Sequence, residues 1–189
     1  MIVKIKKTNS STIRTFLRNQ PDVGVHFNTS GLIRLAEQNE SIYYTITTDS
    51  RIIAVFSFYK SDQDTAYINF TYVTEKYRGI GLMYVVAALI FGLPFFHYPT
   101  IKYVWWNCLT KEYIPMKFYD KLVKDTGDKL TSCLKHKKLY TLTYVLGKDY
   151  VYDHKCWNFI KADNDKILKE IISGENKEYD IADLLKQKV

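Results

Sequence analysis

The feature that most constrains this fold is an almost wholly apolar stretch, Leu82–Ile90, which follows a strand pattern and a glycine-containing turn. A helix that is apolar around its whole circumference has to be buried on most sides. The charge-free run that contains it, Leu82–Phe96, is shorter than the ~20 residues of a membrane span and contains Gly92 and Pro94. We therefore expect a central buried helix in a layered α/β structure, and no membrane span.

Hydrophobic patterns on either side of this helix predict the remaining elements. Strands are expected at 2–6, 41–48, 51–59, 65–73 and 101–108, with a further pair within 130–146. Helices are expected at 10–18, capped by Ser10 or Ser11, at 32–38, capped by Thr29 or Ser30, and from Pro115 to Leu122. The order is β-α-α-β-β-β-α-β-α-β-β, which indicates an α/β (α+β) protein.

Length and composition indicate one globular unit with a terminal addition. The chain has 189 residues, of which 47% are hydrophobic and 25% charged, and these values are typical of a folded domain. The pattern changes after Gly147, so we expect a domain over 1–147 and a C-terminal appendage over 148–189 that packs on it. The N-terminus lacks the long apolar stretch of a signal peptide, which predicts a cytoplasmic protein.

The net charge and the spacing of the cysteines indicate which kinds of binding partner and metal site to expect. The net charge is +7, and the basic excess lies in residues 1–147. Such a surface favours an anionic partner, namely a phosphorylated cofactor, an acidic protein or nucleic acid, although a lysine-rich solubilising surface would look the same. Cys108, Cys133 and Cys156 lack the spacing of a zinc site or a disulfide framework, so no metal is expected.

The turn before the apolar helix has the pattern of an anion site. It reads Arg78-Gly79-Ile80-Gly81 and joins a strand to a helix N-terminus. The unpaired N–H groups of a first helical turn converge, and the helix dipole adds partial positive charge. Glycines allow a phosphate to approach the backbone and Arg78 adds a cation, although four such residues also occur in ordinary tight turns.

The strand before this turn alternates, so its residues separate onto two faces of a sheet. We expect one face to be core and the other to be open to a ligand. The first set is Ala66, Ile68, Phe70 and Tyr72, and the second is Tyr67, Asn69, Thr71 and Val73.

The segment Val73–Leu82 resembles the coenzyme A motif of the GCN5-related N-acetyltransferase (GNAT) superfamily. The resemblance covers about residues 1–147 and includes the strand end, the Arg-Gly-x-Gly turn and a later segment, Phe118–Leu122. It implies a mixed, splayed central sheet flanked by helices, whose two central strands part to admit acetyl-CoA or another acyl-CoA. The cofactor-binding residues that it implies are Thr71, Tyr72, Val73, Arg78, Gly79, Ile80, Gly81, Leu82, Met83 and Asn107. For Asn107, a structural role at the end of the strand is the alternative.

The resemblance also implies catalytic roles. Tyr119 matches the tyrosine that protonates the departing CoA thiolate, and a phenol keeps its proton at neutral pH. Two positions depart from the family: Met83 replaces a small residue, and Tyr67 stands where a carboxylate base is common. The amine proton would then leave through water ordered by Tyr67, Asn69 or Thr71, or through an acid such as Glu75 or Glu112.

The expected function is transfer of an acetyl or other acyl group from acyl-CoA to an amine by direct attack in a ternary complex. The basic surface suits an acceptor on an anionic macromolecule, such as a tRNA, a modified DNA base or a protein. The alternative is a catalytically inactive module of the same fold that binds nucleic acid or a protein partner. The sequence leaves the acceptor and a homodimer open.

Two adjacent tryptophans follow in the strand expected at 101–108. Trp105 and Trp106 should point to opposite faces of the sheet, because side chains alternate along a strand. One is therefore core, and the other is core as well, lines the acceptor site, or stacks on a base or ring.

Overall fold

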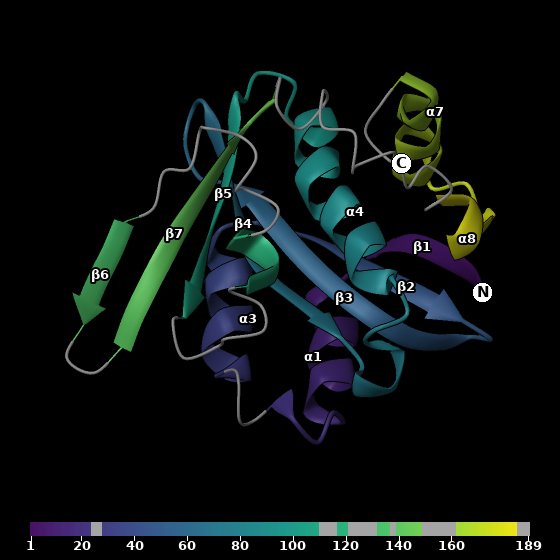
Figure 1. Ribbon diagram of the computed structural model, residues 1–189, viewed down its shortest axis with the longest axis horizontal. Helices are drawn as coiled ribbons and strands as arrows, with labels where there is room; N and C mark the ends of the chain where they lie inside the picture. The colour runs from purple at the N-terminus through teal and green to yellow at the C-terminus, as the bar shows by residue number, and fades with distance from the viewer. Residues whose placement is uncertain (24–27, 110–116, 121–131, 137–138, 149–161, 185–189) are drawn as a thin grey trace.

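The centre of the molecule is one eight-stranded sheet with the order β6-β7-β5-β4-β3-β2-β1-β8, as Figure 1 shows. This computed structural model describes residues 1–23, 28–109, 117–120, 132–136, 139–148 and 162–184. The strands are β1 (Ile2–Thr8), β2 (Ile42–Thr48), β3 (Arg51–Lys60), β4 (Thr65–Val73), β5 (Tyr103–Leu109), β6 (Ser132–His136), β7 (Leu139–Gly147) and β8 (Glu178–Asp180). The helices are α1 (Ser10–Arg18), α3 (Thr29–Gln38), the 3-10 turn η1 (Glu75–Tyr77), α4 (Leu82–His97), α7 (Ala162–Ser173) and α8 (Ile181–Leu184).

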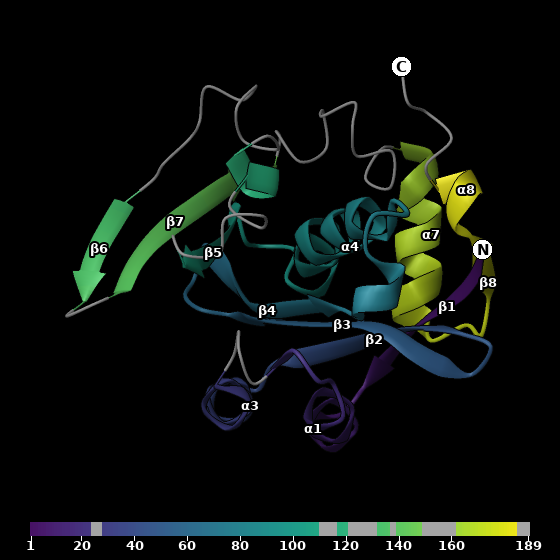
Figure 2. The same cartoon turned by 60° about the horizontal axis from the view of Figure 1, so that its bottom comes forward.

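Helices cover both faces of the sheet. Figure 2 shows α1 and α3 on one face and α4 and α7 on the other. The larger core cluster lies between the sheet and α4, and a smaller one lies beneath α1 and α3. The predicted order of elements from β1 to β7 is confirmed, and so is the mixed character of the sheet, because β4 and β5 are parallel while the other neighbours are antiparallel.

The first two helices begin at Ser10 and Thr29, so their caps, Asn9 and Asn28, lie one residue or more before the predicted ones. The side chain of Asn9 accepts a hydrogen bond from the N–H of Thr12 at 2.9 Å, and that of Asn28 accepts one from Gly31 at 3.1 Å. Asparagine is among the best N-cap residues because its oxygen satisfies an otherwise unpaired N–H of the first turn. The expectation of serine or threonine caps at these helices was therefore wrong.

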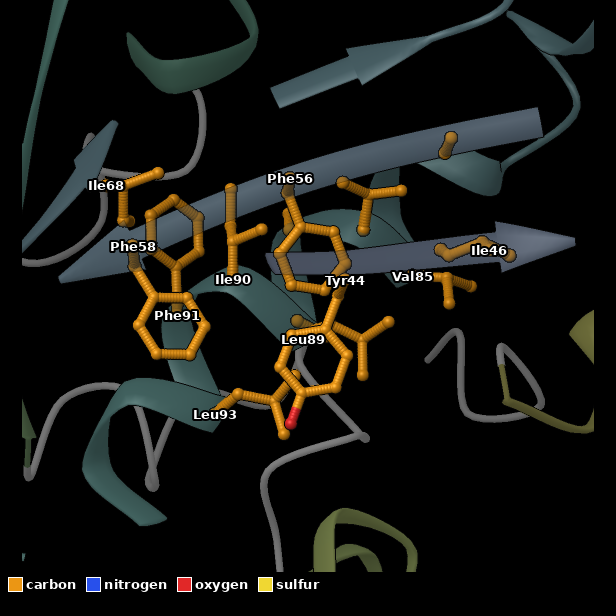
Figure 3. Close-up of a cluster of buried hydrophobic side chains, with 14 of the residues drawn as sticks. Tyr44, Ile46, Phe56, Phe58, Ile68, Val85, Leu89, Ile90, Phe91 and Leu93 are labelled. Atoms are coloured by element: carbon orange, nitrogen blue, oxygen red, sulfur yellow. The ribbon is translucent and has the colours of Figure 1, made fainter. Parts of the chain in front are cut away.

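The central helix is longer than its sequence pattern suggested. α4 continues past Ile90 to His97 and holds Gly92 and Pro94 in its interior. Proline costs about 3 kcal/mol and glycine about 1 kcal/mol in a helix interior relative to alanine. Burial outweighs this cost, because every residue from Val85 to Phe95 is buried. Figure 3 shows its residues Val85, Leu89, Ile90, Phe91 and Leu93 beside the sheet residues Tyr44, Ile46, Phe56, Phe58 and Ile68.

A β-bulge interrupts the alternation of β4. Ser57 is opposite Phe70 but Phe58 is opposite Ile68, so Asn69 is the extra residue. A bulge moves every later side chain to the opposite face. Ala66 and Ile68 lie in the α4-side core, whereas Phe70 and Tyr72 lie beneath α1 and α3 and Val73 returns to the α4 side. The prediction that Ala66, Ile68, Phe70 and Tyr72 share one face was wrong for this reason.

The segment after residue 148 contributes to the same sheet. β8 pairs antiparallel with β1, with Val3 opposite Tyr179, which the sequence pattern did not predict. The helices α7 and α8 lie in this segment, and α7 contacts α4 and β1. In the part of the chain that the structure describes, no helix is long and apolar enough to cross a membrane.

Candidate functional site

The central feature of the site is a strand that is paired on both edges at its start and on one edge at its end. β4 pairs with β5 only from Thr65 to Tyr67, the last pair being Tyr67 with Trp105. On its other edge β4 pairs with β3 as far as Val73. We call the β5-facing side of residues 68–73 the open edge of β4, because the described part of β5 does not pair with it.

The hydrogen-bonding groups along this edge follow from the ladder with β3. The N–H of Thr74 donates to the carbonyl of Ile53 at 2.9 Å. In an antiparallel ladder, successive residues direct their N–H and C=O groups alternately toward and away from the partner strand. The backbone groups of Val73 and Thr71 therefore point away from β3 and into the open edge.

Side chains near this edge also carry unused hydrogen-bonding capacity. The hydroxyl oxygens of Thr71 and Thr74 and the amide oxygen of Asn69 are buried and have no hydrogen-bond partner among the described residues. Buried polar atoms are almost always hydrogen-bonded, to protein, water or ligand. The residues around the end of β4 therefore have the capacity to bind a polar, extended ligand.

The strand leads directly into the glycine turn. Gly79 and Gly81 have φ angles of +81° and +87°, and Gly81 is the N-cap of α4. Only glycine adopts such angles without cost. A side chain at Gly79 would meet nothing within 4 Å, and Ile80 is 50% exposed. The first turn of α4 contains no acidic residue, so the helix dipole and the N–H groups of Leu82 and Met83 are available to an anion, whereas the N–H of Tyr84 donates to the carbonyl of Gly81 at 3.0 Å.

Arg78 is held by contacts that the sequence did not reveal. Its Nε donates to the carbonyl of Val73 at 2.9 Å, and its Nη2 donates to the carboxylate of Asp22, which follows α1. The hydroxyl of Tyr72 donates to the other oxygen of Asp22, and the guanidinium lies 5.4 Å from the centre of the Tyr72 ring. These bonds use the Nε and Nη2 side of the guanidinium, and the side chain remains 41% exposed.

The protonation states of Asp22, Tyr72 and Arg78 depend on one another. Burial disfavours the charged carboxylate of Asp22, but hydrogen bonds from Tyr72 and Arg78 and the charge of Arg78 outweigh it and lower its pKa. The pKa of Tyr72 is raised. Burial is the largest cause, and the hydrogen bond to Asp22 is the next. At neutral pH, Asp22 and Arg78 are therefore a charged pair beside a neutral phenol.

Tyr119 lies on the α4 side of the sheet. Its ring packs against Trp106 at 5.2 Å and Tyr144 at 5.7 Å, and the neighbouring Phe118 contacts Tyr84 of α4 at 5.5 Å. Burial, and to a smaller extent Cys108, raise the pKa of Tyr119 above its ordinary value of 10.0. The phenol therefore keeps its proton at neutral pH. Of the helix expected from Pro115 to Leu122, residues 117–120 are described and are helical, while the rest lies outside the described residues.

The other predicted residues lie on the opposite face. Asn69 donates from its amide nitrogen to the carbonyl of Leu32 in α3 at 3.2 Å. Asn107 accepts a bond from Thr143 at 2.8 Å and directs its amide nitrogen to the hydroxyl of Tyr67 at 3.5 Å. The structure thus brings Tyr67 and Asn107 together and separates both from Tyr119 by the sheet.

Two cofactor candidates in the first turn of α4 differ in exposure. Leu82 is fully buried, while Met83 is partly buried and packs against the α4-side core. Met83 therefore contributes to packing at the position where the resemblance implies a small residue. Among the described residues, no group of His, Cys, Asp and Glu side chains is arranged to hold a metal ion.

Comparisons with known proteins agree with this geometry. No family model and no curated protein sequence matches the chain. Solved structures do match. A GNAT-family acetyltransferase from Desulfovibrio desulfuricans, described as putative, superposes with a TM-score of 0.56 at 11% identity, covering 77% of this chain and 98% of that one. A spermidine N-acetyltransferase variant from Vibrio cholerae has a TM-score of 0.58 at 7% identity, covering 80% and 96%. The chain has the GNAT fold.

A third matching structure was determined with its cofactor. It is yncA of Salmonella typhimurium, described as a putative acetyltransferase with acetyl-CoA, with a TM-score of 0.54 at 10% identity, covering 80% of this chain and 95% of that one. The expected splayed sheet is confirmed, since the parting of β4 and β5 is present in this chain. Sequence reasoning missed Asp22, because nothing in its neighbourhood in the sequence indicates that it meets Arg78 and Tyr72.

Proposed function

We propose that this chain transfers an acyl group, most simply acetyl, from acyl-CoA to an amine by direct attack in a ternary complex. The observation that carries the proposal is the continuity of the open edge of β4 with the glycine turn and the N-terminus of α4. An extended amide-bearing arm with a pyrophosphate at one end fits such a surface. Bound acyl-CoA supplies the thioester that the amine attacks.

Successive segments of the site bind different parts of the cofactor. The outward-facing backbone groups of Thr71 and the N–H of Val73, whose carbonyl accepts from Arg78, pair with the amides of the pantetheine arm, as a neighbouring strand would. The segment Arg78–Met83 holds the pyrophosphate through backbone N–H groups and the free side of the Arg78 guanidinium. Asn107 lies on β5 beyond its last pair with β4, where it can contact the same arm.

The proton transfers follow from the pKa shifts. Tyr119 retains its proton and donates it to the thiolate sulfur when the carbon–sulfur bond breaks. Burial also raises the pKa of Tyr67, so its phenol does not act as a base at neutral pH. The amine proton is released to water, and the unpartnered oxygen of Asn69 or that of Thr71 is an acceptor that can order this water.

Thermal unfolding with and without acetyl-CoA tests whether the chain binds the cofactor. Binding at about 100 times the dissociation constant stabilises a protein by about 2.7 kcal/mol. We expect Tm to rise with acetyl-CoA and the rise to be abolished in Arg78→Glu. No rise with any acyl-CoA, together with salt-sensitive binding of nucleic acid, would instead support the inactive module.

Release of CoA thiol in the presence of amines tests the chemistry. Tyr119→Phe removes the proton donor and keeps the buried ring, so it should retain the Tm rise with acetyl-CoA. Its kcat should fall about a hundredfold, the typical contribution of a positioned acid. An unchanged kcat would exclude Tyr119 as the acid.

A further inference from the structure

An aromatic cluster lies where β4 and β5 part, on the face opposite α4. It consists of Tyr59, Tyr67 and Trp105, each partly exposed. The ring centres of Tyr67 and Trp105 are 4.3 Å apart, and those of Tyr59 and Tyr67 are 5.4 Å apart. Because Tyr67 and Trp105 form the last pair of the β4–β5 ladder, the cluster lies at the inner end of the open edge of β4.

Of the two adjacent tryptophans, Trp105 rather than Trp106 has a ring that a ligand can reach. Trp106 is 3% exposed and contacts Phe91 in the α4-side core at 4.6 Å. Trp105 points to the other face, where its indole N–H donates to Ser61 at 3.0 Å. This bond fixes the orientation of the Trp105 ring. The described helices on this face, α1 and α3, have their main contacts with β2, β3 and β4.

The polar groups of the cluster are neutral and oriented. Thr143 donates to the oxygen of Asn107, so the amide nitrogen of Asn107 faces the hydroxyl of Tyr67 and donates to it. Tyr67 therefore has its own proton available for another acceptor. Burial keeps this phenol protonated by raising its pKa, so the cluster offers flat rings and one hydrogen-bond donor.

The three side chains of the cluster are themselves uncharged at neutral pH. Among the described residues its polar contacts come from Ser61 and Asn107, and none comes from a carboxylate. Burial raises the pKa of Tyr59 and of Tyr67, and no acidic side chain contributes to either shift. A polyamine, which carries several positive charges, needs carboxylates to balance its desolvation.

We propose that the aromatic cluster is the acceptor subsite and that it accepts a flat aromatic amine that is uncharged at neutral pH. This inference rests on the proposed acyl transfer. Flat rings stack on Trp105 and Tyr67, and the hydroxyl of Tyr67 donates to the acceptor. A weakly basic amine reaches the thioester already deprotonated, so it attacks without the carboxylate base that Tyr67 replaces. One proton leaves the amine nitrogen for water as the new carbon–nitrogen bond forms.

Four amines separate the contributions of the ring and of basicity. Aniline is flat and weakly basic, cyclohexylamine has a ring of the same size but is strongly basic, methoxyamine is weakly basic without a ring, and spermidine is a polycation. With saturating acetyl-CoA at pH 7, the full chain should acetylate aniline at least about tenfold more efficiently than cyclohexylamine or spermidine. Faster acetylation of either strongly basic amine would overturn the inference.

Variants of the cluster test the subsite directly. Trp105→Leu should raise KM for aniline about tenfold, because stacking on an aromatic side chain contributes about 1–3 kcal/mol. It should leave KM for methoxyamine unchanged, and Trp105→Phe should restore most of the affinity for aniline. The matched control is Tyr103→Leu, two residues earlier on the same strand face and 45% exposed, which should change neither value.

The cofactor measurement distinguishes the two possible failures. A Tm rise with acetyl-CoA in Trp105→Leu shows that the variant is folded and binds the cofactor. If it does so and KM for aniline is unchanged, the aromatic cluster is not the subsite. A chain that binds acetyl-CoA but acetylates none of the four amines also overturns the inference, and the cofactor part of the proposed function survives. Absence of any acetyl-CoA binding would instead remove the proposed function itself.

Discussion

The two halves of β4 have the same kind of sequence and different surroundings. Ala66 and Tyr67, in the first half, are paired on both edges, whereas the half that ends at Val73 is paired with β3 alone. The bulge at Asn69 lies between the halves. In the first half the backbone groups complete a sheet, and in the second they remain available to a ligand. Stability and binding are therefore assigned to different halves of one strand, and this division can be tested by substitution.

The largest expected effect is in the core beside the fully paired half. Phe58 is fully buried and precedes Tyr59, which pairs with Tyr67 of the fully paired half. Phe58→Ala should lower the free energy of unfolding by about 3–5 kcal/mol, the usual result of removing a buried aromatic ring. Urea denaturation followed by circular dichroism measures this change.

The matched substitution in the open half is Thr71→Val. The hydroxyl of Thr71 is buried and has no partner among the described residues, so an isosteric apolar side chain should change the unfolding free energy by less than about 0.5 kcal/mol. A loss above about 1 kcal/mol would show that the hydroxyl is bonded within the fold. The two halves would then not differ as described.

A second prediction separates backbone strain from binding. Gly79 and Gly174 have φ angles of +81° and +80°, and a side chain at either would meet nothing within 4 Å. Alanine at each should cost about 1–2 kcal/mol of stability, because such angles are unfavourable for L-residues. Only Gly79→Ala should also weaken acetyl-CoA binding in calorimetry, since it adds a methyl group to the turn. Equal affinities in the two variants would place the phosphates elsewhere.

A third prediction concerns the charge beside the turn. Asp22→Asn keeps one oxygen that can accept from Arg78 and places an amide NH2 beside the Tyr72 hydroxyl, which can accept from it, but it removes the negative charge that partly neutralises Arg78. Acetyl-CoA should bind several-fold more tightly, with a steeper dependence on salt. Because the pair is partly exposed, the change in stability should stay below about 1 kcal/mol. Weaker binding would show that Asp22 is needed to position Arg78.

The smallest effect in the working pH range is expected at the far end of α4. His97 bonds to the hydroxyl of Tyr44 at 2.8 Å, and burial, with a contribution from Lys7, lowers its pKa from 6.5 to about 4. The folded state therefore favours the neutral ring. Its contribution is complete above pH 6.5 and is lost as the pH falls toward 4.

This pH dependence can be isolated by substitution. Between pH 7.5 and 6 the Tm should fall slightly, and more steeply below that. His97→Gln should reduce the slope, because glutamine bonds to Tyr44 without titrating. An identical slope in the variant would mean that other groups control the acid response.

Much of the fold was predictable because it depends on local patterns. The strand and helix periods indicated the order of elements to β7, and the Arg78–Gly81 turn indicated the GNAT fold before any geometry was available. The length of α4 was not predictable from Gly92 and Pro94, because those residues are unfavourable locally and are tolerated only through burial. β8 was missed because three residues carry too little pattern to indicate a strand.

The site shows the same division. By itself the sequence determined the glycine turn, since left-handed backbone at Gly79 and Gly81 is a property of those residues. Only the tertiary structure decided that a bulge at Asn69 places Phe70 and Tyr72 beneath α1 and α3, that Asp22 meets Arg78, and that Trp105 rather than Trp106 lies at the open edge. Backbone preferences act between neighbours along the chain, whereas strand register and charge pairing depend on residues that only folding brings together.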